Sequence, residues 1–333
     1  MQVDYLESRM LDHALPPHLV TLALKRIDLD TTRAKLLAAH LPKTLRHLAL
    51  NEVEVGQHDI GPLVLAIPPG VRDLAIVNVQ IGDDLIRELA RVILPNLTHL
   101  RLVSTGVTQR GLMAVIVVLP AGQLVSLTLG GIPLHMETAT ALAAWLARTT
   151  QLKCLGLHHM CTKVAPNAID FVLAALPSSL RSLELPGSLY SATSLATHMS
   201  RVYDLEVLDV SNLLGPPGSL ADLIPTIRYT LKVLRMAYID MYETDLAEML
   251  YRVGRPWCFL VEVDLRCAQL GLQGIENVFY ALERILSCGP GPHQEPRPHV
   301  LLLGNLVTVR QRRFRQIREW WATNGWDIEP CRG

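Results

Sequence analysis

Apolar and polar residues alternate along this chain in a short unit that keeps returning. Residues 97–119 show it well, since Leu97, Leu100 and Leu102 open the unit in the spacing L-x-x-L-x-L, which predicts a half-buried strand. A polar turn follows at 104–106. The unit closes with apolar residues at helical spacing: Leu112, Val115, Ile116 and Leu119. The pattern therefore predicts a strand, a turn and a helix in about 27 residues.

The strand pattern occurs ten times in nearly constant register. The residues that open its copies are Leu19, Leu45, Val71, Leu97, Leu124, Leu152, Leu180, Leu205, Leu231 and Leu260. Successive copies start 25 to 29 residues apart. Self-similarity at such a period is the signature of a solenoid, so we expect one repeat array over residues 19–287.

Simple dimensions give this array a curvature. Paired strands lie about 4.8 Å apart, whereas packed helices need about 10 Å. Stacked strand–helix units therefore bend with the strands inside. We predict an α/β horseshoe of about ten repeats, with a parallel sheet on the concave face and helices on the convex face.

The two ends of the array are expected to differ from its middle, because terminal repeats must cover an open core. We predict an N-terminal cap over residues 1–18, with a short helix, and a Pro/Gly-rich loop over 288–298. A C-terminal cap over 299–333 would then contain a strand at 300–303 and a helix at 308–323.

On these motifs the chain resembles the leucine-rich repeat proteins, and by its long strand–helix unit their ribonuclease-inhibitor-like class. The resemblance covers about residues 15–287. That family often carries Asn or Cys three residues after the last strand leucine. Here the position holds mostly apolar residues: Ile27, Val53, Val79, Thr105, Ile132, Met160 and Ala268. We expect apolar turns in place of the family's hydrogen-bonded turn ladder.

Charge and hydropathy exclude several classes of partner. Lys plus Arg equals Asp plus Glu at 31 each, so no global field favours nucleic acid or an anionic membrane. Residues 111–134 carry no charge, but Pro120, Gly122 and Gln123 interrupt them, which favours a buried helix and strand over a membrane span.

The six cysteines are too few for a disulfide framework in 333 residues. The first fifteen residues include acids and no apolar signal core. We expect a cytoplasmic protein with reduced thiols, with a nuclear location as the alternative.

No motif of a known catalytic class occurs in the sequence, so we expect no enzyme activity and no cofactor. The one metal-like cluster is Cys154, His158, His159 and Cys161. It lacks the usual C-x-x-C spacing of a zinc site, and a repeat strand with a local turn explains it more simply. We predict no metal site.

Five arginines occur within residues 310–318. They would suit a nuclear-import signal, a nucleic-acid patch or a membrane-surface helix. A capping helix with Phe314, Ile317 and Trp321 on its inner face explains the same run and is the interpretation we favour.

The outward-facing position between the last two strand leucines changes character along the chain. It reads Ala23, Ala49, Ala75, Arg101, Thr128, Gly156, Glu184, Asp209, Arg235 and Asp264. A solvated sheet face needs some charge, but rigid strands can also present charges to a partner. We predict a partner-binding site at Glu184, Asp209, Arg235, Glu262, Asp264 and Arg266, and expect the small residues of the first half to let a bulky element approach closely.

The expected function is therefore non-catalytic recognition of an unidentified protein on the concave face, without nucleic acid, membrane or small-molecule substrate. The resemblance leaves two alternatives open. One is a regulator resembling Ran GTPase-activating protein. The other is a substrate-recognition subunit of a ubiquitin ligase, with F-box-like repeats but no visible F-box. A ribonuclease inhibitor proper fits less well, since that protein is acidic and rich in cysteine.

Overall fold

A computed structural model describes most of the repeat array. The described residues are 2–3, 15–27, 31–53, 60–92, 94–160, 167–187, 192–212, 222–223, 226, 230–239, 261–268, 270–287, 299–301, 319 and 328–329. The chain divides into two compact units, here called unit 1 (1–177) and unit 2 (178–333), and each is described by itself.

Unit 1 is built from parallel strands paired in chain order, with helices between them. Its strands are β1 (Gln2–Val3), β2 (Thr21–Lys25), β3 (His47–Asn51), β4 (Asp73–Val77), β5 (His99–Val103), β6 (Ser126–Gly130) and β7 (Cys154–His158). Its helices are α1 (Thr31–Ala39), α2 (Gly61–Leu65), α3 (Gly82–Val92), the 3-10 helix η2 (Leu94–Asn96), α4 (Gln109–Val118), α5 (Met136–Leu146) and α6 (Ala168–Ala174).

Unit 2 continues the same plan with shorter strands, again parallel and paired in chain order. They are β8 (Ser182–Glu184), β9 (Val207–Asp209), β10 (Val233–Arg235), β11 (Glu262–Asp264), β12 (His299–Leu301) and β13 (Ile328–Glu329). The helices described in this unit include α7 (Ala192–Met199) and α9 (Leu272–Ser287).

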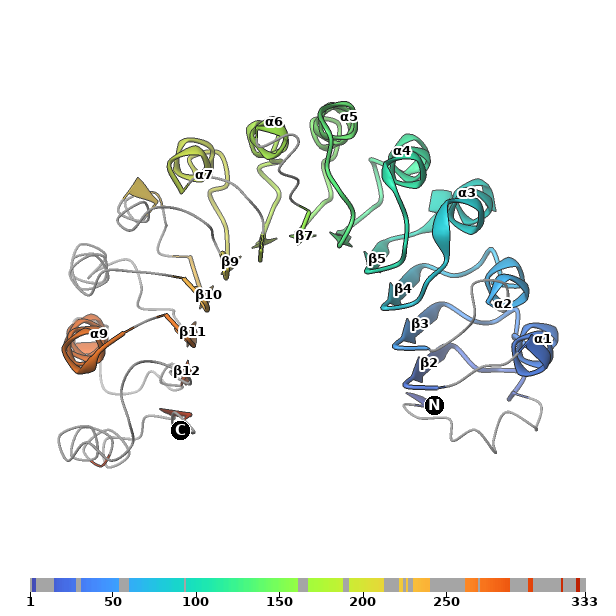
Figure 1. Ribbon diagram of the computed structural model, residues 1–333, viewed down its shortest axis with the longest axis horizontal. Coiled ribbons are helices and arrows are strands. Elements are labelled where there is room, and N and C mark those ends of the chain that lie inside the picture. Colours follow the sequence, from blue (N-terminus) through green and yellow to red (C-terminus); the bar gives the residue numbers. More distant parts are fainter. Residues whose placement is uncertain are drawn as a thin grey trace. The chain divides into compact units, whose positions relative to one another are not determined.

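The apolar positions of the alternating pattern are buried in the core, as expected. In the central repeat, Leu100 and Leu102 of β5 point inward and are at most 1% exposed, as are Leu112 and Val115 of α4. In each unit the strands line the inner side of a bend and the helices lie outside them (Figure 1). All ten predicted strands are present, as β2 to β11, so the α/β solenoid of strand–helix repeats is confirmed.

The turn after each strand is closed by backbone atoms. One residue per repeat has a positive φ of 49° to 67°: Arg26, Glu52, Asn78, Ser104, Gly131, His159, Gly187, Asn212, Tyr238 and Cys267. In most repeats its N–H donates to a carbonyl of the following strand or turn, as Glu52 donates to Val77 at 2.9 Å and Asn78 to Val103 at 2.9 Å. A ladder of backbone hydrogen bonds therefore closes these turns, one residue before the position that holds the apolar side chains.

The apolar part of the turn prediction is confirmed. Three residues after the last strand leucine the side chains are buried, from Ile27 at 6% exposed to Ile132 at 0%. Thr105 occupies this position in one repeat, and its buried hydroxyl has no hydrogen-bond partner among the described residues. These side chains fill the core while the neighbouring backbone makes the hydrogen bonds.

The predicted caps are described only in part. Gln2–Val3 pairs with β2, and β12 covers part of the strand expected at 300–303. The N-terminal helix, the loop at 288–298 and the arginine-rich run lie outside the described residues, apart from Glu319 in the expected C-terminal helix. β13 is a further strand that the sequence did not predict.

The uncharged segment 111–134 forms most of α4 and all of β6, as predicted. Within the described part of the chain, no helix combines the length and hydrophobicity that a membrane crossing requires.

Candidate binding surfaces on the strand faces

The six predicted site residues gather on the outward face of the unit 2 strands. Glu184, Asp209, Arg235 and Asp264 stand in register on the neighbouring strands β8, β9, β10 and β11. Glu262 lies two residues before Asp264 and Arg266 two residues after it, so their side chains flank this row. We call these six residues the charged patch.

Ion pairs hold both arginines of the charged patch. Arg235 Nε donates to Glu262 Oε1 at 2.8 Å across two strands. Arg266 folds back over Asp264, with Nε 2.9 Å from Oδ1 and Nη2 2.7 Å from Oδ2. Such two-pronged pairing fixes the guanidinium in one orientation. The patch is therefore a structured surface rather than a set of independent side chains.

Arg235 is set in a field of carboxylates. Partial burial acts to lower its pKa, but the hydrogen bond and charge of Glu262, together with the charges of Asp209 and Glu184, raise the pKa above the ordinary value. The guanidinium therefore stays charged, and it offsets part of the acidic excess around it.

Asp264 differs from the other five residues because it is only 1% exposed. Its Oδ1 also accepts the backbone N–H of Arg266 at 3.0 Å. A partner molecule would therefore meet Arg266 at this point, while Asp264 holds Arg266 in place.

The two remaining acids lie side by side at the end of the row. Asp209 Oδ1 accepts the N–H of Ser211 at 2.9 Å, and Glu184 Oε1 accepts the hydroxyl of Ser182 at 3.3 Å. Both side chains are half-buried. With four carboxylates against two guanidiniums, the patch carries an excess of two negative charges.

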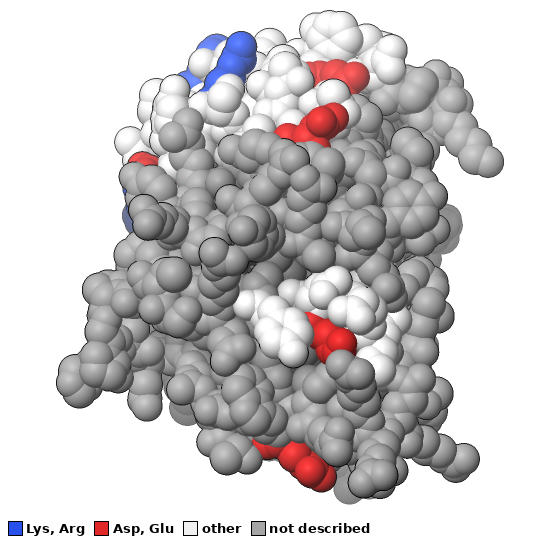
Figure 2. Space-filling model, turned by 90° about the vertical axis from the view of Figure 1, so that its left-hand side faces the viewer, with Lys and Arg blue, Asp and Glu red and all other residues white. Residues whose placement is uncertain are grey.

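Helix α9 lies on the left-hand side of Figure 1. Figure 2 views the protein from that side, where described acidic side chains are visible in separate places and described basic side chains lie near one edge.

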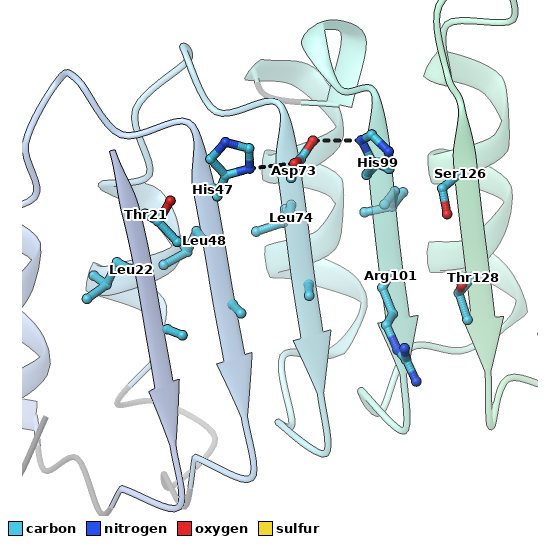
Figure 3. Close-up of a pocket in the computed structure, with 14 residues that line it drawn as sticks. Thr21, Leu22, His47, Leu48, Asp73, Leu74, His99, Arg101, Ser126 and Thr128 are labelled. Carbon is cyan, nitrogen blue, oxygen red and sulfur yellow. Dashed lines mark hydrogen bonds and ion pairs between the residues drawn. The ribbon is translucent and has the colours of Figure 1, made fainter. Parts of the chain in front are cut away.

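A second surface lies in unit 1, where the small outward residues were expected to let a bulky element approach but no site residues were predicted. A hollow of about 390 Å³ lies on the outward face of β2 to β6 (Figure 3). Ala23, Ala49 and Ala75 stand in register on three adjacent strands and form its floor. We call this depression the alanine hollow.

A histidine–aspartate–histidine row borders the alanine hollow. His47 Nδ1 lies 2.5 Å from Asp73 Oδ2, and His99 Nδ1 lies 2.7 Å from Asp73 Oδ1 (Figure 3). The hydroxyl of Thr98 donates to Asp73 Oδ1 at 2.9 Å. Because an ionised carboxylate only accepts hydrogen bonds, both rings present a protonated Nδ1 to it.

These donors stabilise the charge on Asp73. Partial burial acts to raise the pKa of Asp73, but the hydrogen bonds from Thr98, His99 and His47 and the charge of His99 hold it below the ordinary value of 3.8. Both oxygens accept hydrogen bonds, which fixes the orientation of the carboxylate between the two rings.

Arg101 stands beside the floor of the alanine hollow, in register with Ala75 on one side and Thr128 on the other. Its side chain is exposed, and it forms no hydrogen bond or ion pair with any described residue. It is thus a cation held on a rigid strand without an internal counter-ion among those residues.

The row raises the question of a hydrolase triad, since His99 lies between Asp73 and Ser126 on adjacent strands. Acyl transfer also needs a serine bonded to the histidine and donors for the oxyanion. No hydrogen bond joins Ser126 to His99 in the described structure, and the Ser126 N–H is already donated to Thr98 O at 3.2 Å.

The cluster that resembled a metal site divides between described and other residues. Cys154 and His158 are both half-buried on β7, and Cys161 lies outside the described residues. The ring of His158 covers Gly156, where an added Cβ would lie 3.0 Å from His158 Nε2. Among the described residues no group of three or more potential ligands could hold a metal ion.

A signal for the alanine hollow was present in the sequence. His47, Asp73 and His99 follow one another at intervals of 26 residues, which is the repeat period. Each lies two residues before one of the outward residues Ala49, Ala75 and Arg101, and so on the same face of the sheet. Because equivalent positions of adjacent repeats are neighbours in the sheet, this spacing predicts that the three side chains lie side by side.

Neither the scan against protein-family models nor the search of curated proteins found a match to this chain.

Proposed function

We propose that this protein is a non-catalytic recognition module, a leucine-rich repeat solenoid of the ribonuclease-inhibitor-like class, which binds a partner protein through the charged patch. The observation that supports this proposal most is the row of Glu184, Asp209, Arg235 and Asp264 in register on four adjacent strands. Ion pairs fix Arg235 of this row and the neighbouring Arg266.

Rigid presentation favours such a role. Parallel strands hold their side chains in place before binding, so little conformational entropy is lost when a partner docks. The half-buried Glu184 and Asp209 also lose less water on docking than fully exposed acids would. A pre-formed charged row of this kind serves specificity and association rate.

The sign of the patch selects the partner. With two excess negative charges, it complements a basic protein segment and repels nucleic acid. The partner we propose is therefore a protein with a Lys- or Arg-rich docking element. Its identity would decide between a scaffold, a GTPase regulator and a ligase subunit.

The test is affinity capture followed by mass spectrometry, comparing the native chain with a Glu184→Lys/Asp209→Lys variant. Asp264 is left intact because a buried lysine at that position would disturb the fold. The matched control, Glu88→Lys/Glu137→Lys, makes the same charge change on exposed residues of α3 and α5.

We expect a partner that the native chain and the control capture equally, and that the patch variant retains at least about tenfold less, which corresponds to 1.4 kcal/mol. The loss should shrink as salt is raised, because exposed charges are screened. Identical partner sets for all three proteins, with unchanged circular dichroism, would overturn the proposal.

A further inference from the structure

We propose that the alanine hollow of unit 1 is a second docking site, which accepts a protein segment carrying an apolar side chain next to a carboxylate. The site lies in a different unit from the charged patch and shares no residue with it. It therefore stands independently of the function proposed above.

The floor of the hollow fits an apolar side chain. Ala23, Ala49 and Ala75 present three methyl groups on strands spaced about 4.8 Å apart, so the floor runs for about 10 Å. All three alanines are half-buried in the free protein, and covering them would remove apolar surface from water. Larger side chains along the floor would remove this depression.

The borders give the floor its depth. His47, Asp73 and His99 stand along one side, locked together by the two Nδ1 hydrogen bonds, and Arg101 and Thr128 close one end (Figure 3). The volume of about 390 Å³ is within the range of specific ligand sites, about 300–1,000 Å³. Because it lies on an open sheet face, the hollow suits a side chain projecting from a protein segment.

The charge of Arg101 indicates a second feature of the occupant, a carboxylate. Asp73 accepts hydrogen bonds from His47, His99 and Thr98, and among the described residues it makes no ion pair with Arg101. Arg101 is exposed and has no partner among the described residues. A guanidinium pairs best with a carboxylate in a bidentate arrangement, so the occupant should carry Asp or Glu close to its apolar side chain.

The experiment uses a random peptide-display library selected on the immobilised full chain. Enriched peptides are then synthesised, and their affinities are measured by isothermal titration calorimetry. We expect the enriched sequences to share a large apolar residue within about two positions of Asp or Glu, since that spacing spans the distance between neighbouring strands.

Variants then locate the binding site. Ala49→Leu fills the hollow and Arg101→Gln removes its cation, and each should weaken the selected peptides at least tenfold. The control Arg110→Gln removes the same charge from exposed α4 and should leave affinity unchanged. Arg101→Lys should restore part of the affinity, because it keeps the charge without the planar fork.

Three results would overturn the proposal. They are no enrichment at all, an enriched consensus without acidic residues, and affinities that Ala49→Leu leaves unchanged in a protein of native circular dichroism. If binding is lost instead in Glu184→Lys/Asp209→Lys, the peptides bind the charged patch. That outcome would support the function proposed above and contradict this inference.

Discussion

The strand faces of the two units differ although their repeats follow one plan. In unit 1 the outward face has a floor of alanines, and its Asp73 is shared between two histidines. In unit 2 the corresponding face carries a row of charges, and Asp264 is covered by an arginine from its own turn.

The inward columns hardly differ between the units. Leu100 in unit 1 and Leu208 in unit 2 are both at most 1% exposed at the same position of the repeat. The contrast shows that one set of positions supports the fold while another is left to vary. Substitution of polar residues on each strand face tests whether the outward positions also contribute to the stability of the fold.

The largest effect is expected in unit 2, where a polar residue has a structural role. Asp264→Ala would leave the guanidinium and the backbone N–H of Arg266 without their acceptor. Asp264 is buried, but the side chain of Arg266 is 41% exposed and water can solvate the freed guanidinium, so the change should lower the free energy of unfolding by about 1–2 kcal/mol. Chemical denaturation followed by circular dichroism measures the loss.

Asp264→Asn serves as its control, because it keeps the shape and one acceptor oxygen and should cost less. If Asp264→Ala changed the free energy of unfolding by less than about 0.5 kcal/mol, as at a plain surface site, Asp264 would have no structural role.

A smaller effect is expected at Asp73 in unit 1. Asp73→Asn should cost about 1 kcal/mol at pH 7, because three donors lose a charged acceptor. The folded-state pKa of Asp73 is lowered, so its contribution is fully present above the unfolded pKa and is lost as pH falls through the folded value.

The difference in unfolding free energy between native chain and Asp73→Asn should therefore be constant near neutral pH and shrink below about pH 4. Urea titrations at several pH values measure it. A difference that does not change between pH 7 and pH 3 would contradict the assignment of the carboxylate as the stabilising group.

The smallest effect is expected at the turn position that Thr105 occupies in unit 1 and Ile239 in unit 2. Both side chains are buried, but the Thr105 hydroxyl has no partner among the described residues. Thr105→Val should raise the free energy of unfolding by about 0.5–1 kcal/mol, because it removes an unsatisfied polar group at constant shape. Thermal unfolding of the two proteins compares them, and a lower midpoint for the variant would show that the hydroxyl is satisfied in solution.

The sequence predicted the strands well because the same apolar spacing recurs in every repeat, so the strand position of Leu100 is supported by the equivalent residues of the other repeats. It predicted the row from Glu184 to Asp264 for the same reason. Burial of Asp264 was not predicted, since it depends on how Arg266 folds back two residues later. The division near residue 177 also left no mark in the pattern.

The histidine–aspartate–histidine row shows a different limit. His47, Asp73 and His99 are far apart in the chain, and neither their types nor their local context marks them. Only the assumption of an unbroken register brings them together. Their mutual hydrogen bonds then follow from side-chain reach across strands, which periodicity alone does not describe.

The backbone ladder of the turns has a consequence for how such a chain can grow. Each repeat brings its own left-handed residue, and side chains as different as Arg26, Glu52 and Tyr238 serve there because the side chain takes no part in the bond. A duplicated repeat would arrive with both its donor and its acceptor, and a deleted one would remove both. Duplication or deletion of whole repeats can therefore lengthen or shorten the array without leaving an unpaired backbone donor or acceptor where two repeats meet. Substitutions can later give each new strand its own outward residues.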